Sequence, residues 1–220
     1  MVKTETRVQK VAVFPSKEWV ERVLEATEKN NAYKKATRHW NGDFLCIGNG
    51  DEEFLRELGR KEVMEGFISF VNMIPPERRT RYKGTPTGNV FETLGIPFDA
   101  FVENFNADEA LRKASKLSIE DIRAASVYIW VDFWHGAVRN LVPVVPGEHE
   151  DVTFKLSGDY SAWKLLVSGK QDPIVLILRN KLKVETYMSH MPNKARLQMM
   201  RNMKAGIALA KELFASVPVE

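Results

Sequence analysis

The stretch from Val152 to Glu185, VTFKLSGDYSAWKLLVSGKQDPIVLILRNKLKVE, decides the fold. At its start apolar and polar side chains alternate, with Phe154 and Leu156 on one side, which predicts a strand with one buried face. The apolar run over 160–167 predicts a helix, and Gly169 offers the left-handed conformation that ends one. The first half of the stretch therefore predicts a strand followed at once by a short helix.

The second half restarts the helix and returns to a strand. Asp172 is a good N-cap, and Pro173 stands at the first helical position, where proline is tolerated. Residues 174–178 are apolar on nearly every side, so we expect this second helix to be covered all round. The Lys-Leu-Lys run over 181–183 begins the closing strand, which gives the order strand, helix, helix, strand.

This order of elements, and the residues that start and end its helices, resemble the core of the sterol carrier protein type 2 family. The Gly169-Lys170 pair, the Asp172-Pro173 restart and the strand over 181–183 stand where the family pattern expects them. The chain departs from the pattern on both sides of that strand, where family members often carry glycine. The resemblance covers about the last third of the chain and is topological before it.

The resemblance implies an α/β (α+β) fold with a mostly antiparallel, five- to six-stranded sheet covered by helices. We expect one domain over residues 1–220, with residues 51–125 as a helical insertion and residues 127–215 as the best-matching core. The pattern before the core predicts an amphipathic helix over 16–30. The other expected elements are a hairpin over 33–48 that turns at Asn41-Gly42, a helix over 52–74, a loop over 75–89, short helices over 98–105 and 108–116, a helix capped by Ser118, a hairpin over 127–144 and a last helix over 192–214.

The composition bounds the class of protein. The chain has 220 residues, of which 44% are hydrophobic, enough for one well-packed core with an elaboration. Its 32 basic and 29 acidic residues leave a formal net charge of +3, too balanced to indicate nucleic-acid binding. The single cysteine, Cys46, excludes an intramolecular disulfide and fits a reducing compartment. With no signal-like or membrane-spanning apolar run, we expect a soluble, cytoplasmic protein.

Motifs for catalysis are absent from the sequence. There is no Gly-x-Ser-x-Gly elbow, phosphate-binding glycine loop or dinucleotide fingerprint, and the histidines lack metal spacing. Cys46 has no adjacent base and is expected as a buried apolar residue of a strand. We therefore predict no catalytic residue, no metal site and no cofactor.

The first candidate site is an apolar cavity between the sheet, the helix over 174–178 and the methionine-rich last helix. Methionine side chains adapt their shape, which suits a surface for lipids of varying form. Ordinary core packing is the alternative for such stripes. The residues predicted to line the cavity are Phe154, Trp163, Leu166, Ile174, Ile177, Met199, Met200, Met203, Ile207 and Trp130.

The second candidate site is a basic loop. Clustered cations suit an anionic head group or a transient contact with an anionic membrane surface, while a solvated loop is the alternative. The cations of this loop are Arg78, Arg79, Arg81 and Lys83.

The resemblance and the cavity together predict a non-enzymatic protein that binds and transfers a hydrophobic ligand. The expected ligand is a fatty acid, fatty acyl thioester, phospholipid or isoprenoid or sterol-like lipid. The alternatives are an accessory or interaction protein of lipid metabolism and an enzyme that uses the same cavity. A buried Asp132, His135 or His39 facing the cavity favours the enzyme, and a filled core favours the interaction module. The oligomeric state stays open.

Overall fold

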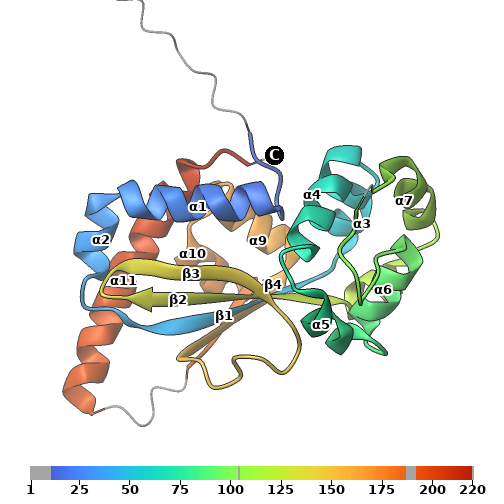
Figure 1. Cartoon of the computed structure of the whole chain (residues 1–220). Helices are drawn as coiled ribbons and strands as arrows, with labels where there is room; N and C mark the ends of the chain where they lie inside the picture. The colour runs from blue at the N-terminus through green and yellow to red at the C-terminus, as the bar shows by residue number, and fades with distance from the viewer. Residues whose placement is uncertain (1–10, 104, 187–191, 220) are drawn as a thin grey trace, which may run out of the picture.

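A computed structural model describes residues 11–103, 105–186 and 192–219. Five strands of these ranges form one sheet in the order β3-β2-β1-β4-β5. Their bounds are β1 Asn41–Asn49, β2 Ser126–Trp134, β3 Ala137–Val144, β4 Phe154–Asp159 and β5 Leu182–Thr186. β1 runs parallel to β4, and the other three neighbouring pairs are antiparallel. The predicted α/β fold, a mostly antiparallel sheet covered by helices, is confirmed (Figure 1).

Helices cover one face of this sheet and extend beyond one end of it (Figure 1). Those near the chain ends are α1 Lys17–Lys29, α2 Asn31–Thr37, α9 Tyr160–Val167, α10 Pro173–Leu178 and α11 Asn193–Ala215. Those between β1 and β2 are α3 Glu52–Leu58, α4 Lys61–Val71, α5 Pro76–Arg79, the 3-10 helix η1 Thr80–Tyr82, α6 Pro86–Leu94, α7 Ala107–Ala114 and α8 Ile119–Ala124. The division into one domain, an insertion over 51–125 and a core over 127–215 stays a prediction.

The segment that decides the fold has the predicted order β4, α9, α10, β5. The Asp172 side chain accepts a hydrogen bond from the Ile174 amide, as an N-cap does, and Gly169 has a φ of +65°. The amino end of α9 is capped by a residue from a distant part of the chain. Asp159 does not cap this helix; instead Asp51 accepts from the Ser161 amide at 2.9 Å while its other oxygen caps α3. One carboxylate thus joins the amino ends of two helices.

The apolar helix α10 is not covered on every side. Leu176 is 2% exposed, whereas Leu178 at the carboxyl end is 77% exposed. Six residues make fewer than two turns, so only part of the helix faces α9, α11 and β5.

The hairpin predicted over 33–48 is wrong. Asn30 accepts a hydrogen bond from the Tyr33 amide and so starts helix α2, while Asn41 and Gly42 begin β1. Glycine is needed at position 42 for a close approach and not for a turn, because a Cβ there would lie 2.8 Å from the Thr153 hydroxyl oxygen. The partners of β1 are the distant strands β2 and β4.

The helical segment between β1 and β2 is more finely divided than predicted. The helix expected over 52–74 breaks at Gly59 and Arg60, where Arg60 takes an extended conformation before α4. The loop expected over 75–89 is mostly helical, since Pro76 and Pro86 both stand at helix starts. Residues 98–103 form no helix, against the prediction.

The remaining local predictions are confirmed. The Ser118 side chain and that of Asp121 form the expected capping box of α8. β2 and β3 form the expected hairpin, with Gly136 at a φ of +83° in its turn. The described chain ends meet where the Ala12 amide donates to the Pro218 carbonyl at 2.8 Å. Among the described residues, no helix combines the length and hydropathy that crossing a membrane requires.

Candidate functional site

An apolar cavity of about 120 Å³ lies between one face of the sheet and the helices that cover it. Its floor is formed by Cys46 and Gly48 of β1 and by Val127, Ile129 and Val131 of β2. These residues share a face because successive side chains of a strand alternate between its two sides. Ile129 and Val131 therefore point toward the same face of the sheet, which is the face that borders the cavity.

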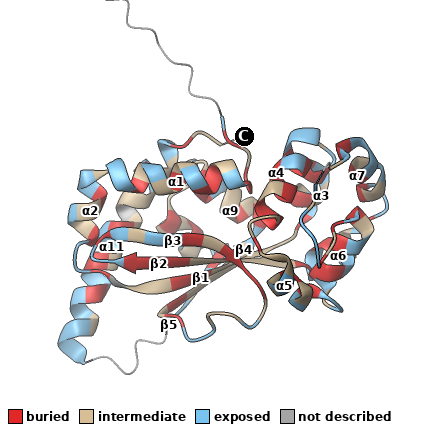
Figure 2. Ribbon diagram, in the orientation of Figure 1, coloured by how far each residue is buried: buried red, intermediate tan, exposed pale blue. Residues whose placement is uncertain are grey.

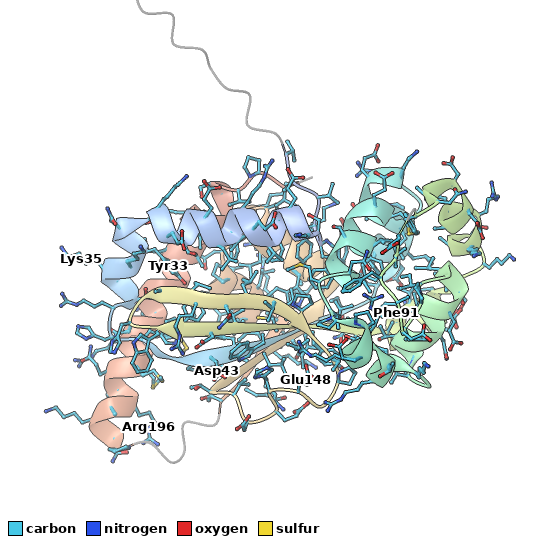
Figure 3. All side chains as sticks on the ribbon, viewed as in Figure 1. Tyr33, Lys35, Asp43, Phe91, Glu148 and Arg196 are labelled. Carbon is cyan, nitrogen blue, oxygen red and sulfur yellow. The ribbon has the colours of Figure 1, made fainter. Side chains whose placement is uncertain are left out.

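The roof of the cavity consists mainly of aromatic rings carried by helices. Phe67 and Phe70 come from α4, which lies in the segment between β1 and β2. Phe91, labelled in Figure 3, comes from the neighbouring helix α6. The other rings of the roof are Trp19 of α1, Phe54 of α3, Tyr160 and Trp163 of α9 and Phe214 of α11.

Gly48 accounts for part of the empty space. A Cβ at this position would meet Val127 Cγ2 at 3.5 Å and Trp163 Cδ1 at 3.7 Å, which are ordinary contacts. The missing side chain therefore leaves room in the middle of the floor. Rigid rings overhead cannot move into that room as flexible aliphatic chains can.

The polar groups at the border of the cavity satisfy one another. Thr87 Oγ1 donates to the Ser126 carbonyl at 2.8 Å and accepts from the Ser126 amide at 2.9 Å. The Ser126 hydroxyl donates to Asn49 Oδ1 at 2.9 Å. Trp163 Nε1 donates to the Ile47 carbonyl at 3.0 Å. With these groups already bonded, the lining offers a ligand mostly hydrocarbon.

A buried charged cluster stands behind the roof. The Tyr160 hydroxyl lies 2.6 Å from Glu57 Oε2 and 2.9 Å from the Phe14 carbonyl, and Lys164 Nζ contacts Glu57 Oε1. Burial and the bond to Glu57 raise the pKa of Tyr160 far above its ordinary value. Burial alone raises the pKa of Glu57, but the bonds from Lys164 and Tyr160 outweigh it, so this pKa lies below its ordinary value. The cluster therefore holds a carboxylate and an ammonium beside an apolar space.

Two further groups of the lining, the Trp19 indole and the Cys46 thiol, take no part in this network of hydrogen bonds. Trp19 is 4% exposed, and its Nε1 has no hydrogen-bond partner. Burial raises the pKa of the Cys46 thiol to about 12, which keeps it protonated and unreactive at neutral pH. The cavity can thus hold an apolar group, and its thiol is no nucleophile.

Trp163 is the one predicted cavity residue that lines this cavity. Phe154 is buried beside it in the core and stacks on Phe44 at 4.9 Å between ring centroids. Leu166 and Ile177 pack with Leu182 in a separate apolar cluster. The remaining predicted residues that lie outside the lining are Ile174, Met199, Met200, Met203, Ile207 and Trp130.

The methionines and Trp130 lie on parts of α11 and of the sheet that do not face the cavity. The methionines lie on the first half of α11, whereas the ring of α11 that reaches the cavity is Phe214 near its carboxyl end. Met199 is 7% exposed in the core, and Met200 is 48% exposed on the other side of the helix. Trp130 lies on the opposite face of the sheet, where its Nε1 donates to Asp43 at 3.0 Å. As ligand contacts, all of these residues stay predictions.

Sequence reasoning missed the phenylalanines of the roof. Phe54, Phe67, Phe70 and Phe91 all lie in the segment expected to be an insertion. The signal was present, because Phe67 and Phe70 stand three residues apart on one face of a helix. Their position across the cavity from β1 and β2 depends on contacts between distant parts of the chain, which a local pattern does not reveal.

The basic loop is largely occupied by contacts within the protein. Arg79 is fully buried and donates to the carbonyls of Ile74, Pro97 and Ala100, each at 2.9 Å. Arg78 forms a bidentate ion pair with Glu148. Arg79 is therefore a structural residue and not a head-group contact, which corrects the prediction for this side chain.

The other two cations of the loop are exposed. Arg81 lies 3.8 Å from Glu148 across a longer ion pair. Lys83 stands over the Phe98 ring at 5.7 Å. A role for Arg78, Arg81 and Lys83 in head-group or membrane contact stays a prediction.

The groups that would favour an enzyme lie away from the cavity. Asp132 is buried on the opposite face of the sheet, where Arg139 pairs with it at 2.8 Å. His39 and His135 are exposed near the β2–β3 turn, and neither lines the cavity. Within the described ranges, no three His, Cys, Asp or Glu side chains gather in a way that could hold a metal ion.

The fold and the cavity define a protein with a mixed α/β sheet and an apolar space beneath its helices. Residues 98–188 match the model of the SCP-2 sterol transfer family. The matched range includes the hairpin β2–β3 and the segment from β4 to β5, and it ends before α11.

Two solved structures are similar to this chain. One is the crystal structure of sterol carrier protein 2, with a TM-score of 0.49 and 15% identity over 93% of this chain and 98% of that one. The other is the solution structure of a conserved hypothetical protein from Thermus thermophilus, with a TM-score of 0.49 and 15% identity over 96% of this chain and 94% of that one. Comparison with curated proteins gives no match.

Proposed function

We propose that this protein binds a hydrophobic ligand non-covalently, with the hydrocarbon part of the ligand in the cavity, and that it transfers that ligand. The ligand classes are a fatty acid, a fatty acyl thioester, a phospholipid or an isoprenoid or sterol-like lipid. The observation that carries the proposal is an apolar space whose bordering groups on Thr87, Ser126 and Asn49 are already hydrogen-bonded to one another. The family match over residues 98–188 supports it.

The driving force is the removal of apolar surface from water. Each buried methylene contributes about 0.8 kcal/mol, so a short hydrocarbon segment already gives useful affinity. The cavity of about 120 Å³ is smaller than the roughly 300–1,000 Å³ of typical ligand pockets. A complete acyl chain therefore requires the rings of the roof to move apart when it binds.

The alternatives are weaker for specific reasons. A filled core would have favoured an interaction module, and the space between Gly48 and the roof is not filled. An enzyme needs a reactive group beside the ligand, and the thiol of Cys46 is held protonated. We therefore propose a non-enzymatic carrier that uses no cofactor.

The test begins with the native protein, extracted with organic solvent beside a mock purification, and mass spectrometry of the released lipid. Binding of a fluorescent acyl-chain probe is then compared between the wild type, Gly48→Val and Ile47→Phe. Valine at position 48 fills the floor, whereas residue 47 has its side chain on the opposite face, in the cluster with Leu45 and Val144. Gly48→Val should weaken binding at least about tenfold, and Ile47→Phe should leave it within about twofold.

Urea unfolding controls for loss of fold. Valine suits a strand better than glycine, so the midpoint of Gly48→Val should not fall. Equal probe affinity for both variants would show that the probe binds elsewhere. No lipid from the native protein and no probe binding by the wild type would end the carrier proposal.

A further inference from the structure

One surface of α11 combines exposed apolar side chains with cations. Leu197, Met200, Arg201 and Lys204 follow the spacing i, i+3, i+4, i+7 and therefore share one side of the helix. We call this side the α11 outward face. Leu197 is 58% exposed and Met200 48% exposed, and both cations are exposed. Figure 2 shows the first half of α11 as largely exposed.

The opposite side of α11 is buried against the body of the protein. Met199 and Asn202 are buried at 7% and 8%, and Gly206 lies against α2. A Cβ at Gly206 would stand 2.8 Å from the Trp40 ring and 3.0 Å from Thr37 Cγ2. The helix is thus fixed to the body of the protein, and its orientation is set by close packing.

Positive charge is concentrated around this face. The chain has no acidic residue from 186 to 211, a range that contains Lys194, Arg196, Arg201, Lys204 and Lys211. Among the described residues, no acidic side chain forms an ion pair with Arg201 or Lys204, and both side chains are exposed.

The neighbouring helix adds cations of its own. α2 and the residue after it carry Lys34, Lys35 and Arg38, and no acidic residue lies from 30 to 42. Lys35 and Arg196 lie at the same end of the molecule (Figure 3). Glu28 of α1 lines the same groove as Lys34 and is the acidic residue on this side of α2.

We propose that the α11 outward face, with α2 beside it, docks the protein on an anionic phospholipid bilayer. The cations contact lipid phosphates, and Leu197 and Met200 enter the boundary between head groups and acyl chains. An amphipathic helix that lies in the membrane plane presents this combination of a basic flank and apolar side chains. The exposed Leu197 and Met200 favour a bilayer over a nucleic acid, whose backbone offers them no apolar partner.

This inference does not rest on the cavity. A bilayer-docking face requires no ligand inside the protein, and ligand binding requires no bilayer. The two proposals therefore fail separately: probe binding without vesicles tests the cavity, and vesicle binding without a ligand tests the face.

The experiment is vesicle flotation of the full chain at low salt. Phosphatidylcholine vesicles are compared with vesicles that contain about 30% phosphatidylserine, which supply the anionic surface. The wild type should float with the anionic vesicles only, and added salt should release it. Arg201→Gln with Lys204→Gln should lower the partition coefficient about tenfold to thirtyfold. Leu197→Gln with Met200→Gln should lower it about tenfold or more.

The matched control is Arg112→Gln with Lys116→Gln, which removes the same charge from exposed positions on α7 and just after it, at the other end of the molecule from α11 (Figure 1). This variant should bind anionic vesicles within about twofold of the wild type. Equal losses for the two charge variants would mean that net charge, and not the α11 outward face, directs binding. Binding of the wild type to neutral vesicles, absence of vesicle binding, or binding to RNA but not to vesicles would each overturn the proposal. All changed residues are exposed, and unchanged urea midpoints confirm that the variants fold.

Discussion

The two faces of the sheet use the same strands but are closed in different ways. One face lies under the helices and encloses the cavity between Gly48, Val127 and the aromatic roof. The other face is closed by the segment over 145–153, and its core residues Leu45 and Val144 are 1% and 0% exposed. Both faces are apolar, so hydrophobicity alone does not make a cavity.

The difference lies in what covers each face. The segment over 145–153 follows the sheet closely, with His149 stacked on Trp130 at 4.1 Å between ring centroids. Asp43, labelled in Figure 3, anchors it by accepting from the Thr153 amide and from Trp130 Nε1, each at 3.0 Å. Helices cannot follow a sheet in this way, and rings on rigid helices leave space over a glycine. Polar anchoring and helical covering thus produce a filled face and a hollow one.

The largest expected effect concerns the charged cluster behind the roof. Glu57→Ala leaves the Lys164 ammonium buried with only the longer contact to Glu53 at 4.0 Å, and should cost about 3–5 kcal/mol of unfolding free energy. Urea unfolding measures the loss. Glu57→Leu combined with Lys164→Leu removes both charges and should recover most of it. A double variant as unstable as Glu57→Ala would mean that packing, and not an unpaired charge, explains the loss.

The same pair gives a pH dependence. Because the pKa of Glu57 lies below its ordinary value near 4.5, the carboxylate contributes stability above that value. This contribution should disappear as the pH falls through the folded-state pKa. Unfolding midpoints measured from pH 7 down to pH 3 should therefore fall less steeply for Glu57→Gln than for the wild type, and parallel curves would contradict the assignment.

A smaller effect is expected on the filled face. Asp43→Ala leaves the Thr153 amide and Trp130 Nε1 without their acceptor, which should cost about 1–3 kcal/mol. Binding of the acyl-chain probe should not change, because the cavity lies on the other side of the sheet. Trp130→Phe removes one donor only and should cost less. A probe affinity that falls with Asp43→Ala would show that the two faces are coupled.

Elements that depend on local contacts could be predicted from the sequence, whereas those that depend on contacts between distant residues could not. Within residues 152–185 the signals are local, and Asp172, Pro173 and Gly169 each set a helix end through their own chemistry. The Asn41-Gly42 pair led to the wrong prediction of a hairpin, because the same dipeptide can form a turn or begin a strand. Only the neighbouring Thr153, more than a hundred residues away, explains why glycine is needed there.

The cavity was predicted as a feature but placed on the wrong helices. The sequence indicated apolar stripes on α10 and α11, yet a stripe does not say whether it fills a core or borders a space. The roof depends on how α4 and α6 lie over β2, which no local pattern in Phe67 or Phe91 reveals. The buried role of Arg79 was missed for the same reason, since its carbonyl partners at Pro97 and Ala100 follow it by 18 and 21 residues.

The smallest expected effect is a change in the rate at which Cys46, on the cavity side of the sheet, is alkylated. Burial raises the pKa of Cys46 to about 12, so very little of the thiol is ionised at pH 8. Alkylation by iodoacetamide should be far slower in the native protein than in urea, and should rise about tenfold for each pH unit between 7 and 9. A saturating acyl-chain ligand should slow it further, because Cys46 lies in the floor of the cavity. Gly48→Val should remove this protection by the ligand, while Ile47→Phe should keep it. Native alkylation as fast as in urea would place Cys46 in contact with solvent and would open the hollow face to water.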